Sequence, residues 1–226
     1  MHSQVDPKHL VGPTLPVGER EVRAVTINTL FGGFGRAGTS GPLGNETDAA
    51  LIGALRSWAD VILVGSGTVQ AEDYGPAHTP MAVLSTSLQL DTDLGIFHGS
   101  RLIVLAPERS LDDVSLEPNR HALRNAGAEL MSSGGGSAPE IINALHEAGF
   151  ARILCEGGPS VYADMLSADL VDVLHLTLDP SIGPEDGPFG LKLGGDQHPR
   201  RFAIEDATVD GTAMLFCRLR RVGERR

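Results

Sequence analysis

Two glycine-rich turns in this sequence each follow a short apolar run and precede a segment of helical character. They are GSGT at residues 65–68 and EGGPS at residues 156–160. Glycines let a ligand approach the main chain closely, and the free N–H groups at the start of a helix attract anions. The turns therefore predict a diphosphate site, although two tight strand-to-helix turns without a ligand are an alternative. The dinucleotide fingerprint G-x-G-x-x-G is not met, because Gln70 occupies its third glycine position.

A third group of candidates lies on a helix predicted to begin at Asn45. Asp48 stands in the first turn, where it would either support the helix cap or act as a buried acid that donates or orients a proton. Arg56 would either bind a phosphate or carbonyl group through paired hydrogen bonds, or lie in solvent near Trp58. The residues alone leave both alternatives open.

Strands and helices alternate over most of the chain, and this order positions the candidate residues. Apolar strands are predicted at residues 21–30, 61–64, 81–84, 102–105 and 153–155. Helices are predicted from residue 45, over residues 118–127 and 138–148, and from residue 159. Buried strands that alternate with helices indicate an α/β fold with a mainly parallel sheet and helices on both faces. Ligands bind outside the carboxyl ends of such strands, where both glycine turns lie.

The last third of the chain has a different character. Strands are predicted at residues 173–178, 201–209 and 213–219, with an antiparallel hairpin across Asp210-Gly211. The strand at 213–219 is expected to be an exposed edge that pairs with a second copy. Residues 1–20 are expected to form an extended arm, and residues 21–226 a single domain.

Composition excludes several classes of protein. The net charge of −11 argues against nucleic acid or an anionic membrane as the main partner. Cys155 and Cys217 are the only cysteines and form no C-x-x-C motif, so a reducing, cytoplasmic setting is expected. The eight histidines have no metal-binding spacing, and no run of about 20 apolar residues could span a membrane.

Several stretches together resemble the pyrimidine reductase of riboflavin biosynthesis, a family whose fold is like that of dihydrofolate reductase. They are GTSGP, ADVILVGSGTVQAEDYGP, and RILCEGGPSVYADML followed by LVDVLHLTLDP. The resemblance runs from about Val22 to the C-terminus. It implies a homodimeric enzyme that uses NADPH to reduce the ribosylamino group of a phosphorylated pyrimidine, with hydride transfer to the sugar C1′. The H-x-E and P-C-x-x-C motifs of the deaminase domain often fused to this reductase are missing, so a stand-alone reductase is expected.

The resemblance also implies roles for individual residues. The residues expected beside the cofactor are Gly65, Gly67, Thr68 and Glu72 from the first turn and its helix, and Gly157, Gly158, Pro159 and Ser160 from the second. Ser40, Arg56 and Glu156 match positions that face the substrate. Asp48 and Glu156 are the candidate catalytic acids. The hydroxyls of Ser85 and Thr86 suit the 2′-phosphate of NADPH, although no arginine stands next to them.

Departures from the family pattern concern the substrate side. The first strand ends in Thr29-Leu30-Phe31-Gly32, so Phe31 replaces the usual acid and is expected to face the acceptor, and Val25 replaces a polar residue. The cofactor turns are kept better than the substrate wall, which indicates a changed substrate. Two alternatives follow: a reductase of the same fold that acts on another heterocycle such as a pterin, and a nucleotide-binding protein without turnover.

Overall fold

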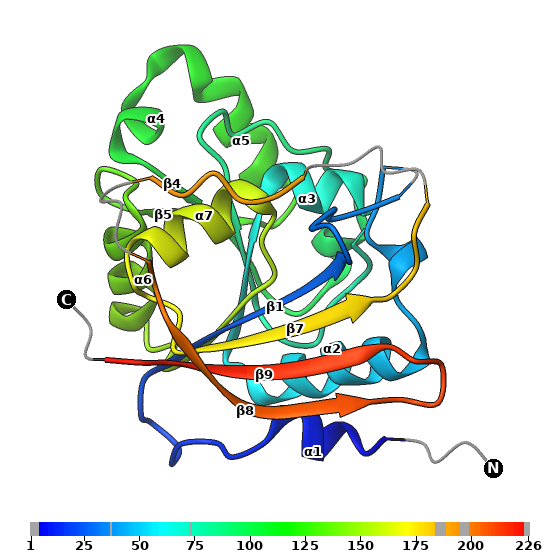
Figure 1. Ribbon diagram of the computed structural model, residues 1–226. Coiled ribbons are helices and arrows are strands. Elements are labelled where there is room, and N and C mark those ends of the chain that lie inside the picture. The colour runs from blue at the N-terminus through cyan, green and yellow to red at the C-terminus, as the bar shows by residue number, and fades with distance from the viewer. Residues whose placement is uncertain (1–4, 37, 73, 184–188, 195–198, 224–226) are drawn as a thin grey trace.

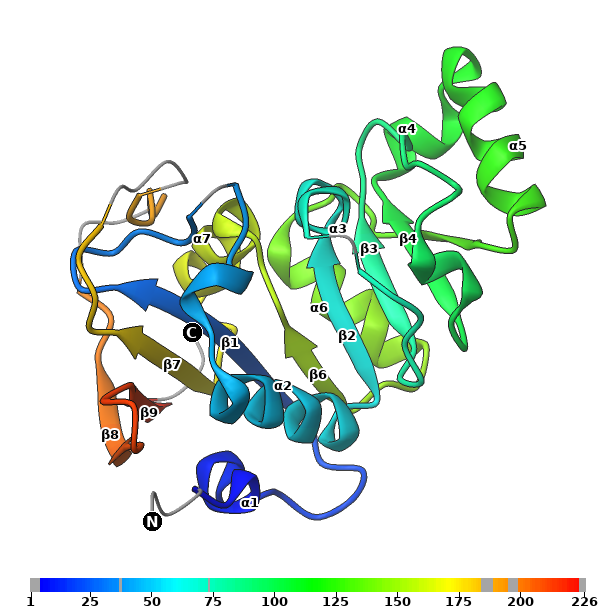
Figure 2. The same ribbon diagram turned by 90° about the vertical axis from the view of Figure 1, so that its right-hand side faces the viewer.

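A nine-stranded sheet runs through the protein in the order β5-β4-β3-β2-β6-β1-β7-β9-β8 (Figures 1 and 2). The computed structural model describes residues 5–36, 38–72, 74–183, 189–194 and 199–223. The strands are β1 (Glu21–Thr29), β2 (Val61–Gly65), β3 (Met81–Leu84), β4 (Leu102–Ala106), β5 (Glu129–Ser132), β6 (Arg152–Cys155), β7 (Val173–Asp179), β8 (Phe202–Val209) and β9 (Leu215–Arg221). All neighbours from β5 to β7 are parallel, and β9 is antiparallel to both β7 and β8. The predicted mainly parallel sheet with a C-terminal hairpin is confirmed.

Helices cover both faces of the sheet, as predicted. They are α1 (Pro7–Val11), α2 (Glu46–Trp58), α3 (Ser66–Ala71), α4 (Glu108–Asp112), α5 (Glu117–Asn125), α6 (Ala138–Glu147) and α7 (Pro159–Ser167). One face packs on α6 and α7, through residues such as Val22, Leu63 and Leu145. The other face packs on α1 and α2 around β1, and on α3 and α5 around β2 to β4. Figure 2 shows α2 on the opposite side of the sheet from α6.

The start of α2 is fixed by its cap and by the C-terminal hairpin. The side chain of Asn45 accepts a hydrogen bond of 2.9 Å from the main-chain N–H of Asp48, which is the predicted N-cap. The same side chain donates to Asp210 at 2.6 Å and to Thr212 at 2.8 Å. The hairpin turn therefore holds the helix that carries Asp48 and Arg56.

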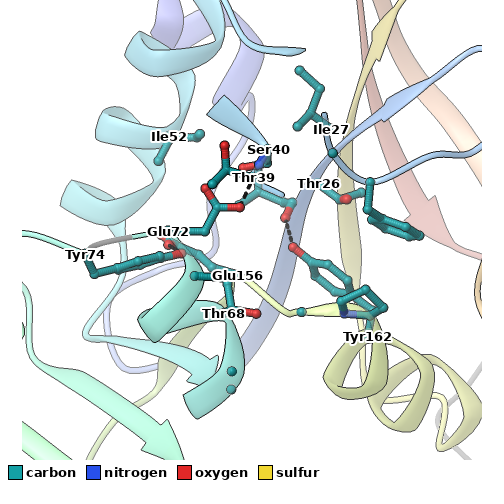
Figure 3. A pocket seen from close by; sticks show the side chains of 18 of the residues that line it. Thr26, Ile27, Thr39, Ser40, Ile52, Thr68, Glu72, Tyr74, Glu156 and Tyr162 are labelled. Atoms are coloured by element: carbon teal, nitrogen blue, oxygen red, sulfur yellow. Dashed lines mark hydrogen bonds between the residues drawn. The ribbon is translucent and has the colours of Figure 1, made fainter. Parts of the chain in front are cut away.

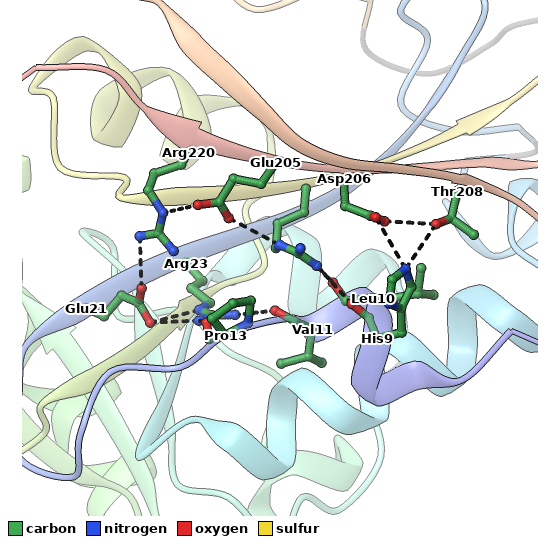
Figure 4. Close-up of polar contacts among 11 residues, drawn as sticks. His9, Leu10, Val11, Pro13, Glu21, Arg23, Glu205, Asp206, Thr208 and Arg220 are labelled. Carbon is green, nitrogen blue, oxygen red and sulfur yellow. Dashed lines mark hydrogen bonds and ion pairs between the residues drawn. The ribbon is translucent and has the colours of Figure 1, made fainter.

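The N-terminal segment is not wholly extended, which corrects the sequence prediction. The helix α1 begins after Asp6, whose carboxylate accepts the N–H of Lys8 at 2.9 Å, and Pro7 is its first residue. This is a standard helix start, but five residues are too few to show an apolar period. Arg23 and Arg218 donate hydrogen bonds to main-chain carbonyls of this segment (Figure 4). Tertiary contacts therefore hold the segment on the sheet.

The hairpin forms where the sequence predicts it, but the exposed edge does not. The strand β9 lies between β7 and β8, so the segment 213–219 is not an edge, and β8 is the end strand of the sheet. Two exposed apolar side chains, Ile204 and Val209, belong to β8. Some short elements were not predicted: β5 (ELMS) is only half-buried and has no continuous apolar run, and the helices α3 and α4 are too short to show an apolar period. Within the described ranges, no helix is long and apolar enough to cross a membrane.

Candidate functional site

A cavity of about 580 Å³ opens at the carboxyl ends of β1, β2 and β6. Its size lies in the range of small-molecule sites. Residues of both predicted glycine turns line it, together with residues of α2 and with Phe34, Gly35, Gly38, Thr39 and Ser40. Figure 3 shows Tyr74 and Tyr162 on opposite sides of this cavity, with Thr68 and Glu156 between them. The cavity thus joins the two turns that the sequence places far apart.

The small residues at the end of β2 are explained by the second turn. The N–H of Gly65 donates to the carbonyl of Gly157 at 2.6 Å, and a Cβ at Gly65 would stand 3.1 Å from Val161. A Cβ at Gly157 would lie 2.3 Å from the ring of Tyr162, and one at Gly158 would lie 2.5 Å from the hydroxyl of Thr68. These three glycines are therefore required by close packing between the turns.

Gly67 has a different reason to be small. It lines the cavity, and a Cβ there would meet no atom within 4 Å.

The helix α7, which begins at Pro159 after Gly158, has no side-chain cap at its N-terminus among the described residues. Its first N–H groups therefore point their positive dipole end toward the cavity without a protein acceptor from a capping side chain. Open space and free donors on this side suit an anionic ligand.

The substrate-side candidates Arg56 and Glu156 form one ion pair. Arg56 donates from Nε to Oε1 of Glu156 at 2.7 Å and from Nη2 to Oε2 at 2.8 Å. The hydroxyl of Tyr74 donates to the same Oε2 at 2.7 Å. The hydrogen bonds that Arg56 donates to Glu156 raise the pKa of Arg56. The paired donors of Arg56 are thus engaged by Glu156, and it is Arg23, rather than Arg56, that lies over the ring of Trp58.

Asp48 is buried at the edge of the cavity. Its side chain does not cap the helix; instead Oδ1 accepts a hydrogen bond of 2.6 Å from the hydroxyl of Thr177 on β7. Burial raises the pKa of the Asp48 carboxyl, and the bond from Thr177 opposes part of this rise. A carboxyl with a raised pKa can remain protonated to higher pH and can donate a proton to a bound group.

Residues 34–35 and 38–40 line another side of the cavity. The main-chain N–H of Ser40 donates to Oε1 of Glu72 at 2.7 Å, which joins the predicted substrate loop to the predicted cofactor helix (Figure 3). Phe34 stacks on Tyr162 with ring centroids 6.2 Å apart. The hydroxyl of Tyr162 in turn donates to the carbonyl of Val25 at 2.5 Å. These contacts fix the shape of this side of the cavity.

Most predicted site residues line this one cavity, but three side chains do not. Ser40, Asp48, Arg56, Gly65, Gly67, Thr68, Glu72, Glu156, Gly158, Pro159 and Ser160 line it. Phe31 lies in a turn after β1 and is 63% exposed, outside the cavity lining. Ser85 is buried with no partner for its hydroxyl among the described residues, and Thr86 is exposed. Gly157 does not line the cavity either, but it packs against the ring of Tyr162, which does.

Several lining or supporting residues were not predicted from the sequence, among them Tyr74, Tyr162 and Thr177. Tyr162 sits on α7 just after the second glycine turn, so its nearness to that turn was a usable signal. Tyr74 and Thr177 reach the site through contacts with Glu156 and Asp48, which are 82 and 129 residues away in the chain. Spacing along the sequence gives no indication of such pairs.

Comparisons with known proteins identify the family of the chain. The RibD C-terminal domain family matches residues 20–216. A 2,5-diamino-6-ribosylamino-4(3H)-pyrimidinone 5′-phosphate reductase from Methanothermobacter thermautotrophicus is 28% identical over 165 residues, which cover 68% of this chain and 74% of that protein. The crystal structure of a pyrimidine reductase-like protein from Corynebacterium diphtheriae is similar with a TM-score of 0.84 and 29% identity, over 97% of this chain and 100% of that chain.

A dihydrofolate reductase from Enterococcus faecalis has a related fold, with a TM-score of 0.53 and 14% identity over 90% of this chain and 97% of that one. The family match extends over most of the chain and includes both glycine turns. The resemblance expected from the sequence motifs is therefore confirmed. The chain belongs to the RibD C-terminal domain family, the pyrimidine reductase family of riboflavin biosynthesis, and has a fold like that of dihydrofolate reductase.

Proposed function

We propose that this protein is an NADPH-dependent reductase that transfers hydride directly to C1′ of the ribosylamino group of a phosphorylated pyrimidine. Membership of the family and the name of the archaeal relative support this reaction class. The observation that carries the proposal is the single cavity, in which an uncapped helix start and open glycine surface face a buried acid across the carboxyl ends of the strands.

The residues on one side of the cavity fit a dinucleotide cofactor. The N-terminus of α7 would hold the diphosphate, with Gly158, Pro159 and Ser160 around it, and Gly67 leaves room for close approach. Thr68 and Glu72 would contact the cofactor from α3 and its end. A bound reduced nicotinamide would supply the hydride. The exposed hydroxyl of Thr86, after β3, is the group that we propose reads a 2′-phosphate.

The acceptor side divides its work between two acids. Glu156 already accepts three hydrogen bonds from Arg56 and Tyr74, so we assign it the role of holding Arg56 against the substrate. Asp48 accepts one side-chain bond and has a raised pKa, so we assign it the role of holding the proton at Oδ2. Ser40 and the outer nitrogen of Arg56 would bind the substrate.

The apolar wall of the cavity supports a second candidate substrate. Val25, Ile27 and Ile52 line the acceptor side around Asp48. Apolar side chains and one carboxyl suit a flat heterocycle with few sugar hydroxyls, such as a pterin, because buried hydroxyls without partners cost about 1–3 kcal/mol each. Comparing NADPH oxidation with the pyrimidine and with a reducible pterin separates the two candidates.

The cofactor side is tested by placing a side chain in its open space. Gly67→Val puts a branched side chain into the cavity, and we expect NADPH affinity to fall by about tenfold or more. Gly53→Val is the matched control, because Gly53 also lies in a helix with no atom within 4 Å but outside the cavity lining. Fluorescence titration with NADPH measures both. Equal affinities would refute the cofactor site, whereas binding without turnover of any acceptor would favour a nucleotide-binding protein.

A further inference from the structure

Tyr74 occupies a fixed position at the rim of the cavity, although it lies in a connection between α3 and β3. A Cβ at Gly95 would lie 3.0 Å from the carbonyl oxygen of Tyr74, so this part of the connection packs tightly against the 3₁₀ helix Gly95–His98. Farther along, the N–H of Ser100 donates to the carbonyl of Ala77 at 2.9 Å, and the hydroxyl of Thr79 donates to the carbonyl of Arg56 at 2.7 Å. Both ends of the connection are thereby anchored.

The side chain of Tyr74 contacts both members of the ion pair in the cavity wall. Its hydroxyl donates to Oε2 of Glu156 at 2.7 Å, and Figure 3 shows the two side chains next to each other. Its ring centroid lies 5.2 Å from Cζ of Arg56. Burial and the nearby Glu156 carboxylate raise the pKa of Tyr74 well above its usual value, so the phenol keeps its proton. The hydroxyl is therefore a constant donor to Glu156, and the ring is a constant support for the guanidinium.

This arrangement decides which way Arg56 faces. Glu156 and Tyr74 hold Nε, Nη2 and one side of the guanidinium plane. The side chain of Arg56 is still 37% exposed and lines the cavity, and Nη1 has no hydrogen-bond partner among the described residues. A long arginine side chain has many rotamers, and fixing it before the ligand arrives lowers the entropy lost on binding.

We propose that Tyr74 is a positioning and specificity-determining residue of the acceptor site, which acts through Glu156 to aim Nη1 of Arg56 at a carbonyl or phosphate oxygen of the acceptor. This proposal rests on the proposed function, because it assigns the Arg56 side of the cavity to the acceptor. It involves no new chemical step. It predicts a change in acceptor binding when the hydroxyl is removed.

The test measures steady-state kinetics with NADPH and 2,5-diamino-6-ribosylamino-4(3H)-pyrimidinone 5′-phosphate. Tyr74→Phe removes one hydroxyl, and we expect the KM for the acceptor to rise by about three- to tenfold. The kcat and the KM for NADPH are expected to change by less than about twofold, because the lost contact affects binding of the acceptor alone. Phe97→Leu is the control, since Phe97 packs against the same apolar cluster as Tyr74 but does not line the cavity.

A double-mutant cycle separates positioning from general stability. Arg56→Lys removes the paired donors, because an ammonium group cannot form the same two parallel bonds. If Tyr74 acts through the Arg56–Glu156 pair, adding Tyr74→Phe to Arg56→Lys will raise the acceptor KM by much less than it does in the wild type. A full multiplicative effect in the double variant would show that Tyr74 acts independently, and would overturn the proposal.

The remaining outcomes are also decisive. Wild-type turnover with an unchanged acceptor KM in Tyr74→Phe would refute the role of Tyr74 alone. Absence of wild-type turnover would refute the proposed function, and the role of Tyr74 with it. Tyr74→Leu removes the hydroxyl and the ring together, and we expect it to raise the same KM further; it decides the question if Tyr74→Phe does not fold.

Discussion

Two groups of arginine and glutamate side chains lie at opposite ends of the central strands. The sealed cluster consists of Glu21, Arg23, Glu205, Arg218 and Arg220. It lies between the sheet and the N-terminal segment (Figure 4). The cavity cluster consists of Arg56, Tyr74 and Glu156. Each pairs an arginine with a buried glutamate. They differ in what the arginine does with its remaining donors.

In the sealed cluster each of the three guanidinium nitrogens of Arg23 donates a hydrogen bond within the protein. Its side chain is fully buried, pairs with Glu21 at 2.9 Å, and donates to the carbonyls of Val11 and Pro13 at 2.7 Å each. Burial, together with the three nearby arginines, lowers the pKa of the neighbouring His175 to about 3, so this histidine stays neutral. The cluster therefore has a structural role, which is to hold the N-terminal segment on the sheet.

In the cavity cluster the arginine keeps a free donor beside open space. The same ion-pair chemistry thus serves structure at one end of the sheet and, in the function that we propose, ligand binding at the other. The difference arises from position, because the carboxyl ends of parallel strands diverge into loops and leave a cavity there. The comparison predicts that variants in the sealed cluster will lower stability, and that variants in the cavity cluster will lower activity.

The largest expected effect on stability comes from the sealed cluster. Arg23→Ala removes the ion pair of 2.9 Å from the buried carboxylate of Glu21, which keeps the longer contact of 3.4 Å to Arg220. It also removes the hydrogen-bond donor of the carbonyls of Val11 and Pro13. We expect the free energy of unfolding to fall by about 3–5 kcal/mol. Urea denaturation measures this, with Arg56→Ala expected to cost clearly less because that side chain is partly exposed. Equal losses in the two variants would contradict the comparison.

The largest expected effect on activity comes from Asp48→Asn. Removing the proton-holding group should lower kcat by about 100-fold. Glu46→Gln is the matched control, since Glu46 lies in the same first turn of α2 but is exposed. Unchanged kcat in Asp48→Asn would show that the proton comes from another group.

The pH dependence of the wild type follows from the raised pKa of Asp48. Activity should fall as pH rises through that pKa, because the protonated acid is lost, and Asp48→Asn should abolish this limb. The folded state binds this proton more tightly than the unfolded state. The free energy of unfolding should therefore decline over the interval from the ordinary pKa up to the raised one, and Asp48→Asn should remove that decline. Denaturation at a series of pH values measures the second effect.

The sequence predicts the main layers and much of the site, for identifiable reasons. The strand at residues 61–64 and the helix from Asn45 are predictable because apolar runs and cap residues are local signals. Both glycine turns are recognisable for the same reason. The pairing of Arg56 with Glu156 is not predictable, because the partners are 100 residues apart and meet only when α2 packs beside the end of β6.

Phe31 and Ser85 show a second limit of sequence matching. Both were expected in the site from the family resemblance, yet Phe31 lies in an exposed turn and Ser85 is buried outside the cavity lining. The side chain of a residue beside a strand end can face either side of the sheet, and one position of difference reverses it. A motif therefore locates a turn better than it locates the side chains within it.

A smaller effect is expected from Thr177→Val. The variant removes the hydroxyl that donates to Asp48 at 2.6 Å, and stability should fall by about 1 kcal/mol. Because this bond lowers the pKa of Asp48, its loss should move the falling limb of the activity to higher pH. A shift of that limb to lower pH, measured in kcat profiles of the two proteins, would refute the assigned role of Thr177.

The smallest effect is expected from Phe31→Asp. Its side chain is 63% exposed and does not line the cavity, so we expect kcat/KM for the pyrimidine to change by less than about threefold, within the small range of surface substitutions. NADPH affinity should be unaffected. A large rise in kcat/KM would instead show that the acceptor extends from the cavity to this turn.

The measurement that most directly tests the central claim is the fate of deuterium from NADPH labelled at the transferable position. If the cavity positions the cofactor against the acceptor for direct hydride transfer, mass spectrometry will find one deuterium on C1′ of the reduced pyrimidine. At subsaturating NADPH, Gly67→Val will form this labelled product about tenfold or more slowly than the wild type, while Gly53→Val will form it at close to the wild-type rate. An unlabelled reduced product, or labelled product formed equally well by Gly67→Val, would contradict the account.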